Sequence, residues 1–312
     1  MSTSGFVAGA LSKTSRFEQP VRDFAMTADV KNKRCVVTGA GSGLGRAMTL
    51  GLARAGALVI AADINIAAVE DTLAELNDGA GRIVPHRVDL TRVEECENLI
   101  ASAVREFGGV DVLVNCAGLN MALISRDFLT KLVRFWDVDA QDWQRMFDVN
   151  VRAPFMLAKC VAPIMTAQGR GRIINVTTSF GTMLREGNTP YGPAKAALEA
   201  ASAGWAQELE ATGVTCNVLI PGGAADTPMI PADAPIARDK LVPPSAMLPP
   251  LLFLASDRSD AVSGIRLVAN RWRPDAPDNE NMDRAGAPIG WPALAASSGV
   301  PTKGSVAAPG SA

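Results

Sequence analysis

Residues 34–45 read Arg-Cys-Val-Val-Thr-Gly-Ala-Gly-Ser-Gly-Leu-Gly, a short apolar run that breaks into glycines and then restarts as a helical pattern. This order predicts a strand, a tight turn and the N-terminus of a helix. Gly39, Gly43 and Gly45 let the backbone turn sharply and approach a pyrophosphate, and the free N–H groups of the helix start attract that anion. The stretch therefore predicts a dinucleotide-binding turn; the alternative is a glycine-rich turn without a ligand.

A second apolar run, residues 58–62, ends in Asp63, eighteen residues after Gly45. An acidic side chain at the tip of a second strand accepts hydrogen bonds from an adenosine ribose and repels a 2′-phosphate. Ser42 and Ile64 offer no positive charge to hold such a phosphate. We therefore expect NAD rather than NADP, the alternative for Asp63 being a helix cap.

Length and composition favour one large α/β domain with two arms. The 312 residues divide into an N-terminal arm (1–30), a Rossmann domain (31–272) and a Pro-, Gly- and Ala-rich C-terminal tail (273–312). A net charge of −2 without long runs of like charge argues against nucleic acid or an anionic membrane as partner and favours a small molecule. The five scattered cysteines predict neither disulfides nor a metal site, which fits the cytoplasm.

Apolar runs alternate with helical patterns along residues 31–270. Strands are expected at 34–38, 58–63, 82–88, 111–115, 172–177, 215–219 and 265–269. This alternation predicts a Rossmann-type, doubly wound parallel sheet of about seven strands with helices on both faces. One helix is expected over 140–165, with Asp139 as N-cap and kinks at Pro154 and Pro163. The segment from Pro221 to about residue 244 is expected to be a mobile lid.

Tyr191 and Lys195 place a phenol and an ammonium four residues apart, on one face of a predicted helix. A free tyrosine has a pKa of about 10, but a nearby ammonium and a nicotinamide cation favour the phenolate. The hydroxyls of Thr177, Thr178 and Ser179 follow the preceding strand, at the edge where doubly wound sheets bind ligands. This arrangement suits proton transfer at an alcohol or carbonyl oxygen. The single histidine, His86, is expected to be a structural strand residue.

These motifs together resemble the short-chain dehydrogenase/reductase family. The resemblance covers residues 31–270 and is carried by Thr38-Gly-x-x-x-Gly-x-Gly45, Asp89, Asn115-x-Ala-Gly118, Asn150, the hydroxyl cluster, Tyr191-x-x-x-Lys195 and Pro221-Gly222. It implies a single-domain NAD(P)-dependent oxidoreductase, often a homotetramer, that moves a hydride between nicotinamide and a carbonyl or hydroxyl carbon. We expect a homo-oligomer, either a tetramer or a dimer.

The resemblance also implies residue roles. Tyr191 would be the acid/base, Lys195 would hold the ribose hydroxyls and lower the tyrosine pKa, and Asn150 would hold the water of a proton relay. The expected cofactor-binding residues are Gly39, Gly41, Ser42, Gly43, Leu44, Gly45, Asp63, Asp89, Leu90, Asn115, Ala117, Gly118, Tyr191, Lys195, Pro221, Gly222 and Thr227.

The sequence departs from the family pattern in several places. Thr178 stands where serine is usual, and Ser179 could substitute as the hydroxyl that polarises the substrate. The segment between Gly118 and Asn150 is longer than usual, and the usual closing Asp-Gly-Gly reads Ala-Asn-Arg at 269–271. Two alternatives to an alcohol dehydrogenase or ketoreductase remain: a non-catalytic dinucleotide-binding regulator or scaffold, and a reductase of C=C or C=N bonds on the same fold.

Overall fold

A computed structural model describes residues 30–76 and 81–293. The N-terminal arm expected at 1–30 therefore lies, except for Val30, outside the described residues, and so does the stretch 294–312 of the expected tail.

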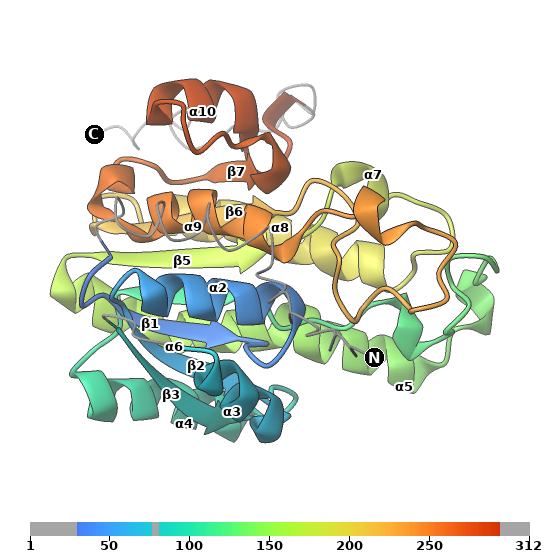
Figure 1. Ribbon diagram of the computed structural model, residues 1–312, viewed down its shortest axis with the longest axis horizontal. Helices are drawn as coiled ribbons and strands as arrows, with labels where there is room; N and C mark the ends of the chain where they lie inside the picture. The colour runs from blue at the N-terminus through green and yellow to red at the C-terminus, as the bar shows by residue number, and fades with distance from the viewer. Residues whose placement is uncertain (1–29, 77–80, 294–312) are drawn as a thin grey trace, which may run out of the picture.

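The described residues form one eight-stranded sheet flanked by helices, which confirms the doubly wound α/β fold (Figure 1). The strand order is β3-β2-β1-β4-β5-β6-β7-β8. Every neighbouring pair is parallel except β7 and β8, which are antiparallel. The strands are β1 (Arg34–Thr38), β2 (Leu58–Asp63), β3 (Arg82–Arg87), β4 (Val112–Asn115), β5 (Gly171–Val176), β6 (Val214–Ile220), β7 (Ile265–Val268) and β8 (Gly286–Pro288).

The two larger hydrophobic cores lie on the two faces of the sheet. The first packs beneath α2, α3 and α9, and the second beneath α4, α6 and α8 (Figure 1). The α-helices are α2 (Gly43–Arg54), α3 (Ile66–Ala74), α4 (Val93–Phe107), α5 (Ala140–Phe147), α6 (Ala153–Gln168), α7 (Phe180–Met183), α8 (Tyr191–Glu208), α9 (Leu248–Ala255) and α10 (Asp278–Ala285). All residues of β4, β5 and β6 are buried, because helices cover both faces of a parallel sheet.

The order of strands reverses between β1 and β4, whose connections run to opposite sides of the sheet. In open α/β sheets, ligands bind outside the carboxyl ends of the strands at this reversal. The glycine turn after β1 and the segment after β4 both lie there.

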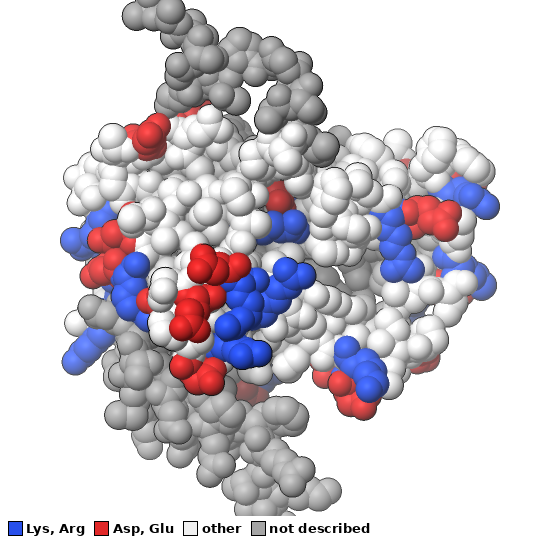
Figure 2. Space-filling model, turned by 90° about the horizontal axis from the view of Figure 1, so that it is seen from above, with Lys and Arg blue, Asp and Glu red and all other residues white. Residues whose placement is uncertain are grey.

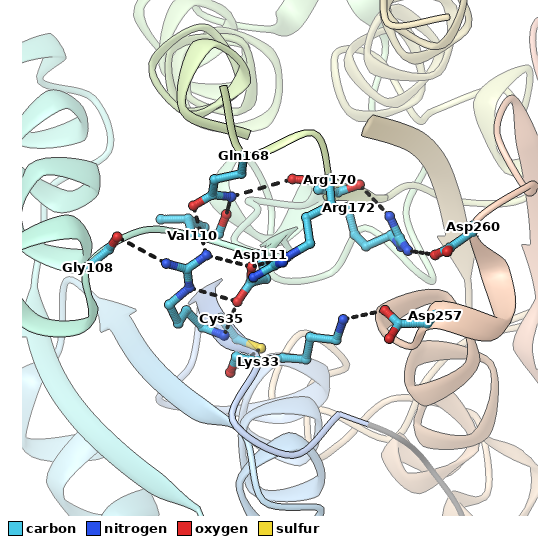
Figure 3. Close-up of polar contacts among 12 residues, drawn as sticks. Lys33, Cys35, Gly108, Val110, Asp111, Gln168, Arg170, Arg172, Asp257 and Asp260 are labelled. Atoms are coloured by element: carbon cyan, nitrogen blue, oxygen red, sulfur yellow. Dashed lines mark hydrogen bonds and ion pairs between the residues drawn. The ribbon is translucent and has the colours of Figure 1, made fainter. Parts of the chain in front are cut away.

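The opposite, amino-terminal edge of the sheet is tied by a charged network (Figure 3). Asp111, directly before β4, accepts hydrogen bonds at 2.8 and 2.7 Å from the guanidinium of Arg34 on β1. Arg170, before β5, also donates to Asp111, at 3.3 Å. Arg172 on β5 pairs with Asp260 after α9. Ion pairs thus join three central strands and a neighbouring loop at the edge away from the expected ligand site.

The helix expected over 140–165 is interrupted. A π-helical turn, Asp148–Arg152, separates α5 from α6, and Asn150 lies inside it. Pro154 is the second residue of α6, directly after the π-helical turn, and Pro163 lies inside the helix. Asp139 caps α5 as expected, accepting from the Gln141 N–H at 2.7 Å.

The region expected as a tail from residue 273 begins instead with helix α10 and strand β8. The β8 strand pairs antiparallel with β7, so the sheet has eight strands rather than about seven. Asn281 on α10 fixes the turn before it, because its amide accepts from the Arg273 N–H at 2.8 Å and donates to the Arg273 carbonyl at 2.8 Å. Local polar contacts thus hold a stretch whose composition is typical of a linker.

On the face drawn in Figure 2, acidic and basic side chains lie intermixed among uncharged surface. Within residues 30–76 and 81–293, no helix is long and apolar enough to cross a membrane.

Candidate active site

The glycine turn packs too tightly to hold larger side chains. Gly39 and Gly43 have positive φ angles of 69° and 52°. A Cβ on Gly39 would lie 2.9 Å from the Ala117 backbone, and one on Gly43 would lie 2.9 Å from the Thr227 side chain. A Cβ on Gly45 would lie 2.0 Å from the Gly39 carbonyl oxygen, which shows how closely helix α2 approaches the turn. This cradle at the start of a helix fits the pyrophosphate of a dinucleotide.

The rest of the turn is shaped by backbone contacts. Ser42 is the residue preceding α2 and makes no capping hydrogen bond with its side chain. Leu44 packs partly against the first core. The two residues therefore contribute the backbone of the helix start to the cradle.

Asp63 lies at the end of β2, beside the glycine turn. One carboxylate oxygen accepts from the Gly41 N–H at 3.0 Å, and the other accepts from the Asn65 N–H at 3.0 Å. A Cβ on Gly41 would approach this carboxylate to 3.2 Å. Capping of the helix after β2 was the alternative role expected for Asp63. That helix, α3, is capped by Asn65, whose side chain accepts from the Ala68 N–H.

Asp89 follows β3 and closes a short turn. Its carboxylate accepts from the Thr91 hydroxyl at 2.7 Å and from the Thr91 N–H at 3.0 Å, and these bonds hold the pKa of Asp89 below its ordinary value. Leu90 packs partly against the second core. His86 lies within β3, paired with Ala62, as expected of a strand residue.

The segment after β4 is bonded to β1 and β5. The Thr38 hydroxyl accepts from the backbone N–H groups of Cys116 and Ala117, each at 3.1 Å. The Asn115 amide donates to Asn175 on β5 at 2.8 Å. These bonds fix the carboxyl ends of three neighbouring strands relative to one another.

Lys195 and Asn150 meet at Gly118. A Cβ on Gly118 would lie 3.1 Å from Asn150 Oδ1 and 3.3 Å from Lys195 Nζ, so only glycine leaves room between them. Lys195 Nζ donates to the Val176 carbonyl at 2.9 Å. The Asn150 amide bonds both backbone groups of Leu119, accepting from its N–H at 2.8 Å and donating to its carbonyl at 2.9 Å.

Burial shifts the pKa values of Tyr191 and Lys195 on helix α8. It lowers the pKa of Lys195 to about 8. It also raises the pKa of the Tyr191 phenol, outweighing the hydrogen bond with Thr178 that lowers it. The nearby Cys116 raises the pKa of both groups, which adds to the effect of burial on Tyr191 and opposes the effect of burial on Lys195. In the chain by itself the tyrosine is thus held protonated, whereas a lowered tyrosine pKa was expected from the sequence.

The two candidate hydroxyls have different positions. Thr178 makes the side-chain hydrogen bond with Tyr191. Ser179 caps α7 instead: its hydroxyl accepts from the Thr182 N–H at 3.2 Å and lies 2.7 Å from the Thr182 hydroxyl. The expectation that Ser179 could serve at the substrate oxygen therefore conflicts with its capping role.

The Pro221-Gly222 turn after β6 is held by Asn270. The Asn270 N–H donates to the Pro221 carbonyl at 3.1 Å, and its side-chain amide donates to the Gly222 carbonyl at 3.1 Å. Gly222 has a φ of 91°, and a Cβ there would lie 2.1 Å from the Asn270 side chain. The sequence departure at 269–271 thus provides the bonds that hold this turn.

The segment after Gly222 forms a closed loop beside the site. A single bridge joins Ala225 to Val242, and Arg238 donates to Asp226 at 2.8 Å. The loop reaches the opposite side of the site, because Asn120 donates to the Met229 carbonyl at 2.9 Å. Met229 follows shortly after Thr227, which lies against Gly43.

Sequence reasoning overlooked Cys116 and Glu199. Cys116 lies near Tyr191 and Lys195, yet it looked like one of several scattered cysteines. Glu199 is buried on α8 and could have been found from spacing, since positions 191, 195 and 199 share one helix face. The expected site residues outside helices lie at the carboxyl ends of the strands or in the loops that follow them, and Gly43, Leu44, Gly45, Asn150, Tyr191 and Lys195 lie in helices.

A family model described as short chain dehydrogenase matches residues 33–235. The 3-oxoacyl-(acyl-carrier-protein) reductase of Thermotoga maritima is 33% identical over 244 residues, covering 75% of this chain and 95% of the relative. The 2,5-dichloro-2,5-cyclohexadiene-1,4-diol dehydrogenase of Sphingobium indicum is 31% identical, covering 78% of this chain and 96% of the relative.

Solved structures agree with the sequence matches. A Beutenbergia cavernae protein assigned as an NAD(P)-dependent gluconate 5-dehydrogenase, with NADP bound at low occupancy, superposes with a TM-score of 0.68 at 30% identity. The match covers 77% of this chain and 95% of that one. These matches agree with the glycine cradle and with the edge of the sheet at which the polar groups gather. The chain belongs to the short-chain dehydrogenase/reductase family.

Proposed function

We propose that the protein is an NAD-dependent oxidoreductase that transfers a hydride between a secondary alcohol or ketone and nicotinamide, with Tyr191 as the acid/base. The observation that carries the proposal is that Tyr191, with Thr178, and Lys195 both lie near Cys116, whose neighbour Ala117 packs against Gly39 of the glycine cradle. A hydroxyl, a phenol and an ammonium next to a dinucleotide site are the groups needed to bind and protonate a carbonyl oxygen.

Each side chain then has one task. The nicotinamide ring of the cofactor supplies the hydride chemistry when bound. The Thr178 hydroxyl binds the substrate oxygen, and Tyr191 Oη takes its proton during oxidation or returns it during reduction. Lys195 stays close enough to Gly118 and Asn150 to pass a proton towards solvent through water held by the asparagine.

The preference for NAD rests on Asp63. Its carboxylate stands beside the glycine turn, where it can accept from ribose hydroxyls and repel a 2′-phosphate. Two arginines near this end of the sheet already face glutamates, since Arg46 pairs with Glu75 and Arg87 with Glu95. The solved relative that holds NADP makes this preference worth measuring.

The names of the relatives favour chemistry at oxygen-bearing carbon. One is a reductase of 3-oxoacyl groups and another a diol dehydrogenase. This supports a carbonyl or hydroxyl substrate over the reduction of C=C or C=N bonds. Exposed apolar side chains on α7 and in the adjoining loops, among them Phe180, Leu184 and Met229, support a substrate with an apolar portion.

The experiment is a titration of NADH and NADPH by fluorescence, followed by an absorbance screen of secondary alcohols with NAD. We expect turnover in the natural protein and its loss in Tyr191→Phe, with NADH binding retained. Tight binding with no turnover across the panel would instead favour the non-catalytic regulator. Product analysis that finds a reduced C=C or C=N bond would instead favour a reductase of such bonds on the same fold.

A further inference from the structure

Two oppositely charged side chains are buried behind the candidate active site. Glu199 on α8 is 1% exposed, and the Arg266 side chain on β7 is 12% exposed. Arg266 points towards α8, because it alternates along β7 with Leu267, which packs in the core on the opposite face.

The pair is bonded to two consecutive residues of the segment after β5. Glu199 Oε2 accepts from the Thr177 hydroxyl at 3.0 Å, and its Oε1 lies 3.6 Å from an Arg266 nitrogen. A second Arg266 nitrogen donates to the Thr178 carbonyl. The ion pair thus holds the side chain of Thr177 and the peptide group of Thr178.

This arrangement is costly for the fold. Burial raises the pKa of Glu199, with Arg266 and Thr177 opposing the rise. The Arg266 Nε has no hydrogen-bond partner among the described residues. Buried ion pairs often give less stability than apolar side chains of similar volume, so stability alone is a weak explanation for this one.

We propose that Glu199 and Arg266 are positioning residues that hold the Thr178 hydroxyl against Tyr191. The proposal rests on the function proposed above and adds to it two residues that touch neither substrate nor cofactor.

A chain of contacts connects the Glu199–Arg266 pair to the Tyr191 phenol. Thr178 hydrogen-bonds the phenol with its side chain while Arg266 holds its carbonyl. The next residue, Ser179, is fixed by capping α7. If Arg266 is removed, the Thr178 peptide is held only by its neighbours, and its hydroxyl loses a fixed direction.

The chain offers an unusually clean readout, because Tyr191 is its single tyrosine. Labelling tyrosine with 13C at Cζ gives one resonance whose pH titration reports the Tyr191 phenol, without any need for turnover. Cys116 after β4 is the titratable group that acts on the Tyr191 pKa, Lys195 shares a face of α8 with Tyr191, and neither is altered in the variants below.

The variants are Glu199→Gln and Arg266→Met, with Arg266→Lys as the conservative replacement. Asp111→Asn is the matched control, since it breaks another buried ion pair of the same sheet at the opposite edge. We expect the Tyr191 pKa to rise by about one pH unit in Glu199→Gln and Arg266→Met. We also expect kcat to fall about tenfold with an unchanged NADH dissociation constant. Arg266→Lys should restore part of both, and Asp111→Asn should change neither.

An unchanged Tyr191 titration in folded Glu199→Gln and Arg266→Met overturns the proposal, as does an equal shift in Asp111→Asn. If Arg266→Met does not fold, an unchanged titration in Glu199→Gln alone overturns it. The function proposed above fails separately, by the absence of turnover in the natural protein, and the resonance still tests the positioning role.

Discussion

Lys195 keeps an ammonium group where water has little access. The residue is 5% exposed, and burial lowers its pKa to about 8. A single backbone carbonyl, that of Val176, accepts from it at 2.9 Å. The unfolded chain holds the same proton up to a pKa of about 10.4. Below pH 8 the folded state therefore carries the full cost of the buried charge, and this cost disappears as pH rises from 8 to about 10.4.

Lys195→Met should accordingly stabilise the cofactor-free protein at pH 7 by about 2 kcal/mol, the relief of the buried charge less one lost hydrogen bond. The gain should shrink as pH rises from 8 towards 10.4, and turnover should be lost. Urea unfolding at pH 7 and pH 10 measures it. A destabilised Lys195→Met protein at pH 7 would show that the ammonium helps to hold the fold.

We expect Asp63 to decide between the two cofactors. Asp63→Ala removes the acceptor for ribose hydroxyls and the charge that repels a 2′-phosphate. We expect NADH affinity to fall about tenfold and NADPH affinity to rise. Fluorescence titration of both nucleotides checks this, with Asp71→Ala on the neighbouring helix α3 as a control for charge. Unchanged preference would exclude Asp63 as the selecting group.

Residue types and spacing were enough to predict the glycine turn, Asp63 and the Tyr191–Lys195 face. They could not decide between Thr178 and Ser179, which are adjacent hydroxyls. That choice depends on where α7 begins, because the residue before a helix turns its side chain back to the free N–H groups. A four-residue helix in a polar loop leaves no periodic pattern in the sequence.

At the scale of elements, the π-helical turn between α5 and α6 was hidden from the sequence. Helical residues run on through 140–168, and periodicity alone reads them as one helix. The wider turn places Asn150 so that it bonds Leu119 on both backbone groups. π-helical turns are rare and often lie at functional sites. The asparagine was predicted from the family resemblance, but the element that carries it was not.

We expect the charged network of Figure 3 to help to hold the central strands together. Asp111→Asn should lower the free energy of unfolding by about 3 kcal/mol, because Arg34 would lose its buried carboxylate partner. Burial pushes the pKa of Asp111 up, but Arg34 outweighs it and holds the pKa below its ordinary value. The stabilisation is therefore present above about pH 4 and is lost as pH falls through the lowered pKa.

Urea unfolding of Asp111→Asn and the natural protein at pH 7 and at pH 3 checks both statements. The difference between the two proteins should be large at pH 7 and smaller at pH 3. A constant difference across this range would mean that the carboxylate charge contributes nothing.

For the whole molecule, the alternation of strands and helices was sufficient to predict the doubly wound sheet, because right-handed crossovers leave few other arrangements. The eighth strand was missed, since its three residues, Gly-Ala-Pro, have low strand propensity and join the sheet only by pairing with β7. Tertiary pairing, which composition does not encode, brings this part of the chain back to the fold.

The chain after β8 also reaches the substrate side of the molecule. The Trp291 ring lies 5.6 Å from that of Phe180, in the helix next to Thr178 and Ser179. Trp291→Ala should raise KM by up to about tenfold while leaving the NADH dissociation constant unchanged. Steady-state kinetics with the best substrate of the screen measures it, with Trp136→Ala as a control, because Trp136 is an exposed tryptophan outside this contact. An unchanged KM would separate the C-terminal segment from substrate binding.

We propose that this chain transfers a hydride with Tyr191 as the acid/base. The most direct measurement uses a secondary alcohol deuterated at its carbinol carbon, with NAD, and follows the deuterium by NMR. The proposed function predicts deuterium at C4 of the nicotinamide with the natural protein and none with Tyr191→Phe. Tight NAD binding without label transfer from any alcohol of the panel, or equal transfer by Tyr191→Phe, would contradict it.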